Sequence, residues 1–103
     1  MDHAKEWGIR RQRFVRAIAE DNDEEAEAAV HTLLPEDEAW LLELLAASPP
    51  DGDPDRRWWA VRALAACGSG PCVPAVTQAL DDADASVRAV AVLALSYLHE
   101  RVP

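Results

Sequence analysis

Hydrophobic residues recur every three or four positions along most of the chain, which is the period of an amphipathic α-helix. Trp7, Phe14 and Ile18 show the pattern in the first segment, where Arg11 lies on the same face and contributes its aliphatic stem. Polar breaks, several of them rich in proline or glycine, separate such segments. The spacing therefore predicts six helices, at about residues 4–19, 23–34, 35–47, 55–67, 72–80 and 85–100.

Cap and turn residues support these boundaries. Asp21, Asn22 and Asp23 offer N-cap oxygens to the second helix, and Pro35 suits the first position of the third. The stretch SPPDGDPD, residues 48–55, ends the third helix. Because the connections are short, successive helices are expected to pack as antiparallel hairpins.

Composition favours the same all-α fold. Half of the 103 residues are hydrophobic, mostly alanine, leucine and valine, and alanine and leucine are strong helix formers. Few threonine and isoleucine residues remain for a sheet. The length is typical of one domain, so residues 1–103 are expected to form a single helical domain.

The net charge of −9 is unevenly distributed. Residues 20–43 hold ten carboxylates and no Lys or Arg, whereas residues 1–19 carry most of their charge as cations. These cations are Lys5, Arg10, Arg11, Arg13 and Arg16. We expect them to pair with the acidic segment. An acidic chain is repelled by polyphosphate, so nucleic acid is not an expected partner.

No stretch has the roughly 20 apolar residues that a membrane-spanning helix needs. The N-terminal sequence MDHAKEWGIRRQRF also lacks the apolar middle region of a signal peptide. A cytoplasmic location with reduced thiols, and no membrane partner, is therefore expected.

An internal repeat is the most informative feature of the sequence. Shifting the chain by 31 residues places residues 51–67 on residues 82–98, with seven identities in seventeen positions. The identical pairs are Asp51/Asp82, Asp53/Asp84, Arg57/Arg88, Ala60/Ala91, Val61/Val92, Ala63/Ala94 and Leu64/Leu95. Residues 51–81 are thus predicted to form one repeat and residues 82–103 a last, incomplete one, after divergent helices in residues 1–50.

The repeated pattern, D-x-D-x-x-V-R-x-x-A-x-x-A-L, resembles the HEAT-like repeats of the phycobilisome-lyase type. It is clearest in DDADASVRAVAVLALSYL and departs at Arg56, where Val87 stands in the later copy. The resemblance implies a short right-handed α–α superhelix. It also implies a structural ladder between adjacent repeats, formed by Asp51, Arg57, Asp82 and Arg88.

The stretch CGSGPC holds both cysteines of the chain. In the 31-residue register Cys67 falls on Leu98, a core position, while Gly68 and Pro71 suit the turn to the next helix. Two thiols are too few for a structural zinc site, and redox pairs usually have a two-residue spacer. A buried thiol and a turn thiol are expected, and a disulfide between them stays open.

The acidic clusters are expected to cap helices. The run EDNDEEAE lacks the alternating ligands and central glycine of a calcium loop. The aspartates near residues 51–55 and 81–84 have no histidine or serine in a catalytic pattern beside them. No metal, cofactor or catalytic residue is therefore predicted, and the chain is not expected to be an enzyme.

Two surfaces are candidates for protein binding. Trp58 lies nearly opposite the core face of its helix, with Arg62 one turn later to stack on its ring; burial under neighbouring helices is the equally supported alternative. The last helix is apolar almost all round and includes Leu93 and Tyr97. Either the chain is part of a longer array or this face meets a partner, self-association being the simplest case.

The sequence predicts a non-catalytic interaction module that binds a protein or peptide, or forms a homodimer through the C-terminal helix. Two alternatives come from HEAT-like relatives. A bilin lyase-like enzyme is one, although no catalytic signature is present to support it. A nucleic-acid-binding protein is the other, with Arg10, Arg11, Arg13 and Arg16 as its only basic candidates.

Overall fold

A computed structural model describes residues 3–47 and 52–101 of the chain. The described residues contain helices and no strand, which confirms the predicted all-α class. Three short 3₁₀ turns, η1 to η3, accompany six α-helices. In chain order the elements are α1 (His3–Ala19), α2 (Asp23–Val30), η1 (Pro35–Asp37), α3 (Glu38–Ala47), α4 (Pro54–Cys67), η2 (Gly70–Cys72), α5 (Val73–Gln78), η3 (Ala79–Asp81) and α6 (Ala85–Arg101).

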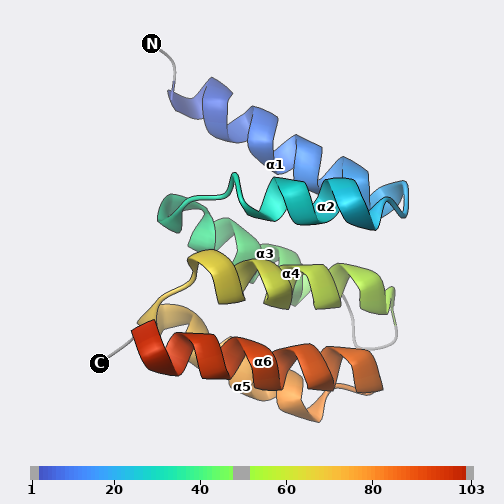
Figure 1. Ribbon diagram of the computed structural model, residues 1–103, viewed down its shortest axis with the longest axis vertical. Helices are drawn as coiled ribbons and strands as arrows, with labels where there is room; N and C mark the ends of the chain where they lie inside the picture. Colours follow the sequence, from blue (N-terminus) through green and yellow to red (C-terminus); the bar gives the residue numbers. More distant parts are fainter. Residues whose placement is uncertain (1–2, 48–51, 102–103) are drawn as a thin grey trace.

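The helices stack in three layers (Figure 1). Helices α1 and α2 form the first layer, α3 and α4 the second, and α5 and α6 the third, with the two termini at opposite ends of the stack. Helices α2, α4 and α6 cross the front of the view, and α3 and α5 lie behind them. The radius of gyration is 12.9 Å, close to the value of about 13 Å for a compact chain of this length. The arrangement is the predicted α–α solenoid.

Small residues bring α4 and α6 together. Ala60 and Ala63 of α4 and Ala91 and Ala94 of α6 are all fully buried, as is Leu64. Alanine leaves the two helix backbones free to approach closely, and the leucine fills the space that remains. The repeated alanines of the sequence thus form the seam between adjacent repeats.

The N-terminal helices are tied to this core by aromatic side chains. Phe14 of α1 is fully buried, and its ring lies edge-on to Trp40 of α3 and to Trp59 of α4, at centroid distances of 6.2 and 6.4 Å. Such edge-to-face pairs are favourable beyond the area they bury. One side chain therefore joins three helices.

Charged side chains also fix α1 to the segment before α3. Arg10 Nε donates to Asp37 Oδ2 at 2.8 Å and Arg11 Nε donates to Asp37 Oδ1 at 2.7 Å. Arg10 also pairs with Glu36, and Arg13 with Glu25. The expected pairing of the basic first helix with the acidic segment is confirmed for these residues.

Two helix boundaries differ from the prediction. Helix α2 ends at Val30, four residues early, and the next helix begins with the 3₁₀ turn η1. Leu34 precedes a proline and is extended, with φ −119° and ψ 163°, because the proline ring disfavours the helical conformation there. Its N–H donates to Asp37 Oδ2 at 2.8 Å, so the carboxylate caps the new turn.

The segment predicted as helix 72–80 contains a shorter α5 between two 3₁₀ turns. At its end the Ala79 N–H is shared between several preceding carbonyls, including those of Ala75 and Val76. Such shared bonds are common where an α-helix tightens into a 3₁₀ turn. The predicted position is therefore right, and the α-helical length is overestimated.

Gly68 ends α4 as predicted, for a different reason. Its backbone is extended, at φ −76° and ψ 169°, so no left-handed conformation requires a glycine. A Cβ at this position would instead lie 2.5 Å from the Leu64 carbonyl oxygen and 2.6 Å from Cys72 Sγ. The turn after α4 thus leaves room only for glycine.

Candidate functional site

The four residues predicted to bind a partner lie on two neighbouring helices. Trp58 and Arg62 belong to α4, and Leu93 and Tyr97 belong to α6. In the 31-residue register Arg62 corresponds to Leu93. Because α4 and α6 pack side by side as successive copies of the repeat, these residues occupy corresponding faces of the two helices.

On α4 this face is largely covered. Trp58 is partly buried against the core, and its ring lies edge-on to Trp59 at a centroid distance of 4.8 Å. Arg62 Nη2 donates to Glu27 Oε1 of α2 at 2.5 Å, rather than stacking on Trp58 as the sequence analysis expected. Helix α2, lying next to α4, supplies the carboxylate that holds the guanidinium. Trp58 is thus partly covered by neighbouring side chains, and its role in binding a partner stays a prediction.

On α6 the face is open. Leu93 and Tyr97 are each 47% exposed and lie one turn apart, and Val92 is 61% exposed. Val92 directly precedes Leu93 in the chain, and its side chain lies about 100° from that of Leu93 round the helix axis. Large apolar side chains on several sides of a helix are unusual for a surface helix, whose outer face is normally polar.

The ladder residues lie at the helix starts. Arg57, almost fully buried, donates from Nε and Nη2 to the two carboxylate oxygens of Asp82, at 2.8 and 3.0 Å. Arg88 instead donates to the carbonyls of Asp82 and Ala83 in its own turn. Asp51 lies outside the described residues. The pair joins the N-terminal end of α4 to the segment that leads into α6.

Arg101 joins the C-terminal ends of α4 and α6, a contact that the sequence pattern does not predict. Arg101, in the last turn of α6, donates to the carbonyl oxygens of Leu64, Ala66 and Gly68 at 3.1–3.4 Å. Carbonyls at the end of a helix have no partner within the helix, and a cation is favourable there. Helices α4 and α6 are therefore parallel and clamped at both ends.

The two thiols have no reactive character. Both cysteines are free, and Cys72 is fully buried, with its Sγ within 3.1 Å of the Ser69 carbonyl oxygen. Burial first, and then the nearby carboxylates, raise the pKa of Cys67 and the pKa of Cys72 to about 11. A thiol with such a pKa is almost wholly protonated at neutral pH and is a poor nucleophile.

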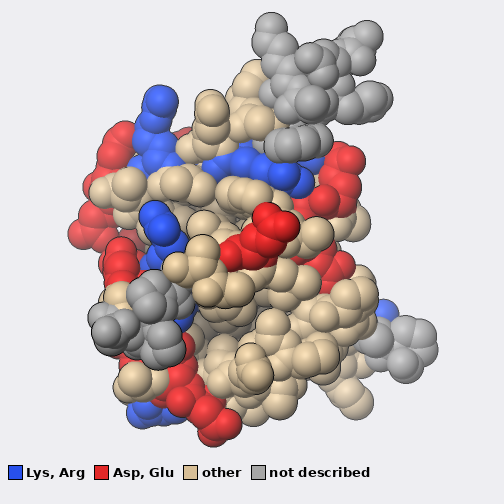
Figure 2. Space-filling view, turned by 180° about the vertical axis from the view of Figure 1, so that it is seen from behind, with Lys and Arg blue, Asp and Glu red and all other residues tan. Residues whose placement is uncertain are grey.

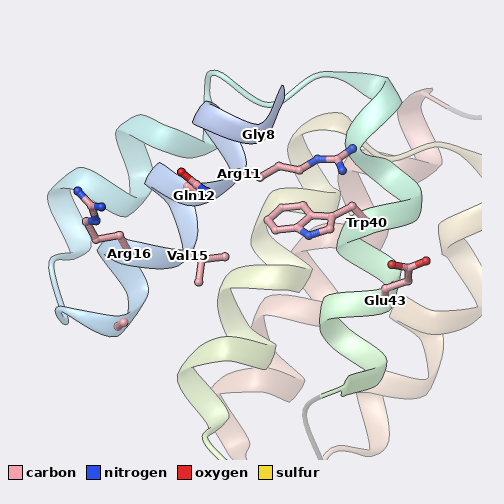
Figure 3. Close-up of a pocket in the computed structure, with 8 residues that line it drawn as sticks. Gly8, Arg11, Gln12, Val15, Arg16, Trp40 and Glu43 are labelled. Atoms are coloured by element: carbon pink, nitrogen blue, oxygen red, sulfur yellow. The ribbon is translucent and has the colours of Figure 1, made fainter. Parts of the chain in front are cut away.

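A groove lies between α1 and α3 (Figure 3). Its volume is about 790 Å³, within the range of ligand-binding clefts. Trp40 of α3 and Arg11 of α1 point toward each other across it, and the guanidinium carbon lies 5.2 Å from the indole centroid. The lining residues are Gly8, Arg11, Gln12, Val15, Arg16, Ala19, Trp40 and Glu43.

Charge in the groove is carried by three of these residues. Arg11 is already paired with the buried carboxylate of Asp37. Arg16 is exposed on α1 and Glu43 is exposed on α3, at the two ends of the view in Figure 3. Within residues 3–47 and 52–101, neither of these two side chains has an ion-pair partner. The groove thus combines the apolar surface of Val15 and Trp40 with one open cation, Arg16, and one open anion, Glu43.

The helical face below the groove is uncharged mainly over α5. Figure 2 shows the molecule from behind, where an uncharged area covers α5, acidic side chains lie over α3 and cationic side chains gather above them. The exposed residues of these two helices include Ala39, Glu43, Ala46, Pro74 and Thr77. A surface of this kind suits binding of another apolar surface better than chemistry on a charged substrate.

Sequence periodicity did not reveal the groove, because its two walls lie more than twenty residues apart in the chain. The signal that points to the groove is Gly8, a glycine inside a helix, whose missing side chain leaves open space.

Metal binding and membrane crossing find no support in the described part of the chain. No group of three or more His, Cys, Asp or Glu side chains there is arranged to hold a metal ion. None of the helices in that part is both long and apolar enough to span a bilayer.

Comparison with known proteins identifies the repeat. Residues 38–101, from the start of α3 to the end of α6, match the family of HEAT repeats. No curated protein and no solved structure matches the chain. The matched segment covers more than half of the sequence and includes the parallel helices α4 and α6 with their shared alanine seam. The chain belongs to the HEAT repeats family.

Proposed function

We propose that this protein is a non-catalytic interaction module that binds a protein partner through the exposed apolar side of α6, with a second copy of the chain as the first candidate. HEAT repeats generally act as protein-interaction scaffolds. The observation that carries the proposal is the exposure of Leu93 and Tyr97, one turn apart on α6. A partner helix that covers them would bury apolar surface, and each Å² of apolar surface removed from water stabilises the complex by about 25 cal/mol.

The repeat subtype belongs to the same proposal. The acidic turn before α6 and the buried arginine of α4 resemble the phycobilisome-lyase type of HEAT-like repeat. The two-pronged bond from Arg57 to Asp82 supports that assignment, because a ladder between adjacent repeats needs such a contact. In this proposal Asp51, Arg57, Asp82 and Arg88 have a structural role and do not contact the partner.

Sedimentation velocity tests self-association directly. The weight-average mass of the wild-type chain should rise with concentration, around a dissociation constant of about 1–100 μM for a small interface. Leu93→Asp and Tyr97→Asp should each hold the chain as a monomer. Ile9→Asp is the matched control, because Ile9 is an exposed apolar residue on α1, at 61% exposure, away from α6.

Two results would count against the proposal. A wild-type chain that stays monomeric over the whole concentration range removes the second copy as a partner. Equal loss of association in Ile9→Asp and Leu93→Asp would show that association is not specific to α6.

A further inference from the structure

We propose that the groove between α1 and α3 is a second binding site, which takes an acidic amphipathic segment of a partner protein. An apolar side chain of that segment would lie against Trp40 and Val15, and a carboxylate would bind Arg16. The site is separate from the α6 face, so this inference does not depend on the function proposed above.

The shape of the groove carries the first step. Its volume of about 790 Å³ is large enough for several side chains, and it is open to solvent. Gly8, Val15 and Ala19 leave space between the longer side chains of the α1 wall, and the partly buried ring of Trp40 forms much of the other side. A rigid aromatic ring beside small residues is a common anchor point for an apolar side chain at an interface.

The charge of the α1 wall carries the second step. Arg10, Arg11 and Arg13 are each bound to a carboxylate of this chain. Arg16 lines the same groove, and its side chain has no ion-pair partner in the described part of the chain. An incoming carboxylate would therefore find an open cation at one edge of an apolar surface, which favours an acidic occupant.

Glu43 on the opposite wall determines the orientation in which an acidic segment would bind. Because it repels a second carboxylate placed near it, an acidic segment should enter with its negative end toward Arg16 and away from α3. Nucleic acid fits the site less well. Binding of a phosphate backbone needs several open cations along its length, whereas Arg16 and the already paired Arg11 are the cations that line this groove.

The probe is a fluorescein-labelled synthetic helical peptide with leucines at i, i+3, i+4 and i+7 and glutamates beside them, read by fluorescence anisotropy. A peptide with lysine in place of every glutamate is the matched probe, and a single-stranded oligonucleotide is the competitor. The variants are Gly8→Leu, which fills the groove, and Arg16→Glu, which reverses its open charge. Ile9→Ser is the control, because Ile9 is exposed on the same helix and does not line the groove.

The acidic peptide should bind the wild-type chain with a dissociation constant below about 1 mM, and at least about tenfold more tightly than the lysine peptide. Gly8→Leu and Arg16→Glu should each weaken that binding about tenfold or more. Ile9→Ser and Leu93→Asp should leave it unchanged, and added salt should weaken it. Amide shifts on peptide addition should cluster in α1 and α3.

Other outcomes overturn the proposal. These are no binding of the acidic peptide, equal binding of the lysine peptide, full binding by Gly8→Leu, or tighter binding of the oligonucleotide. Circular dichroism of each variant checks that the fold is kept, and Gly8→Leu places a good helix former where glycine is unfavourable. A chain that binds the peptide but stays monomeric would retain this site and lose self-association through α6, so the two failures are distinguishable.

Discussion

The carboxylate of Asp37 shows how single residues organise the N-terminal half. It is fully buried, and it accepts hydrogen bonds from Arg10, from Arg11 and from the Leu34 N–H. Burial alone would raise the pKa of Asp37. The bonds from Arg10, Leu34 and Arg11 outweigh that effect and hold the pKa below its ordinary value. A buried charge is tolerated here because three donors surround it.

Replacing Asp37 by asparagine should therefore destabilise the fold. Asp37→Asn keeps the size of the side chain but removes the charge that faces two arginines. We expect a loss of about 2–4 kcal/mol in the free energy of unfolding at pH 7, as for a broken buried charge pair. Urea denaturation of both proteins measures it. Glu36→Gln is the control, because that side chain is more than half exposed and should cost less than about 1 kcal/mol.

The pH dependence of this difference has a defined sign. Since the pKa of Asp37 is lower in the folded than in the unfolded chain, the unfolded chain binds more protons between the two values. The stabilisation is fully present above the unfolded value of about 3.9 and is lost as the pH falls through the folded value. The gap between wild type and Asp37→Asn should thus shrink in acid. A gap that is constant from neutral pH to about pH 3 would contradict the assignment.

At the scale of elements, the clamp between α4 and α6 has the clearest consequences. Arg57 is 4% exposed, and both prongs of its contact with Asp82 are at hydrogen-bond distance. The contact raises the pKa of Arg57 and lowers the pKa of Asp82, so both groups stay charged at neutral pH. The fork of the guanidinium matches the two carboxylate oxygens, which an ammonium group cannot do.

A double-mutant cycle on Arg57→Leu and Asp82→Asn should show strong coupling. The two changes together should cost at least about 1.5 kcal/mol less than the sum of the single changes, because each single change leaves one buried charge without its partner. Chemical denaturation of the four proteins gives the value. Arg57→Lys should recover only part of the wild-type stability. Purely additive effects would mean that the contact does not link the two helices.

The elements also show what the sequence could and could not predict. The alanines of α4 and α6 occupy the same positions in the 31-residue repeat, and small apolar residues repeated in this way indicate a packed helix interface. The early end of α2 did not, since it depends on Asp37 reaching back to the Leu34 N–H. Arg62 pairs with a carboxylate 35 residues away on α2, a contact that the spacing within one helix does not predict. Contacts between distant segments leave no periodic signal, and the groove beside Trp40 was missed for that reason.

For the whole molecule, α4 is the central element. It contacts α1, α2, α3 and α6, and many of its side chains are fully buried. In a stacked repeat protein each layer is stabilised mainly by its neighbours, so a helix with neighbours on both sides should open last. Helices at the ends of the stack have neighbours on one side among the described residues.

Amide hydrogen exchange tests this order of opening. The amides of Ala60, Val61, Ala63 and Leu64 in α4 should exchange most slowly. Those of α1 and α5 should exchange faster, since α1 lies in the first layer and α5 is only a short helix in the last. Mass spectrometry after timed deuteration resolves the helices. Equal protection of all helices would indicate one all-or-none unit instead.

The side chains that close the helix ends set a limit on how this chain can be rearranged. The Asp82 carboxylate accepts a hydrogen bond from Arg57, and Arg101 donates to the Leu64 carbonyl oxygen. The Glu38 carboxylate accepts hydrogen bonds from the N–H and the hydroxyl of Ser69. In each case the donor and the acceptor of the hydrogen bond belong to two different repeats. A segment of one 31-residue period, cut out and grafted into a different array, would arrive with these groups unsatisfied. Engineered arrays built from this chain should therefore exchange pairs of neighbouring repeats, because the interface between them is the smallest transferable part.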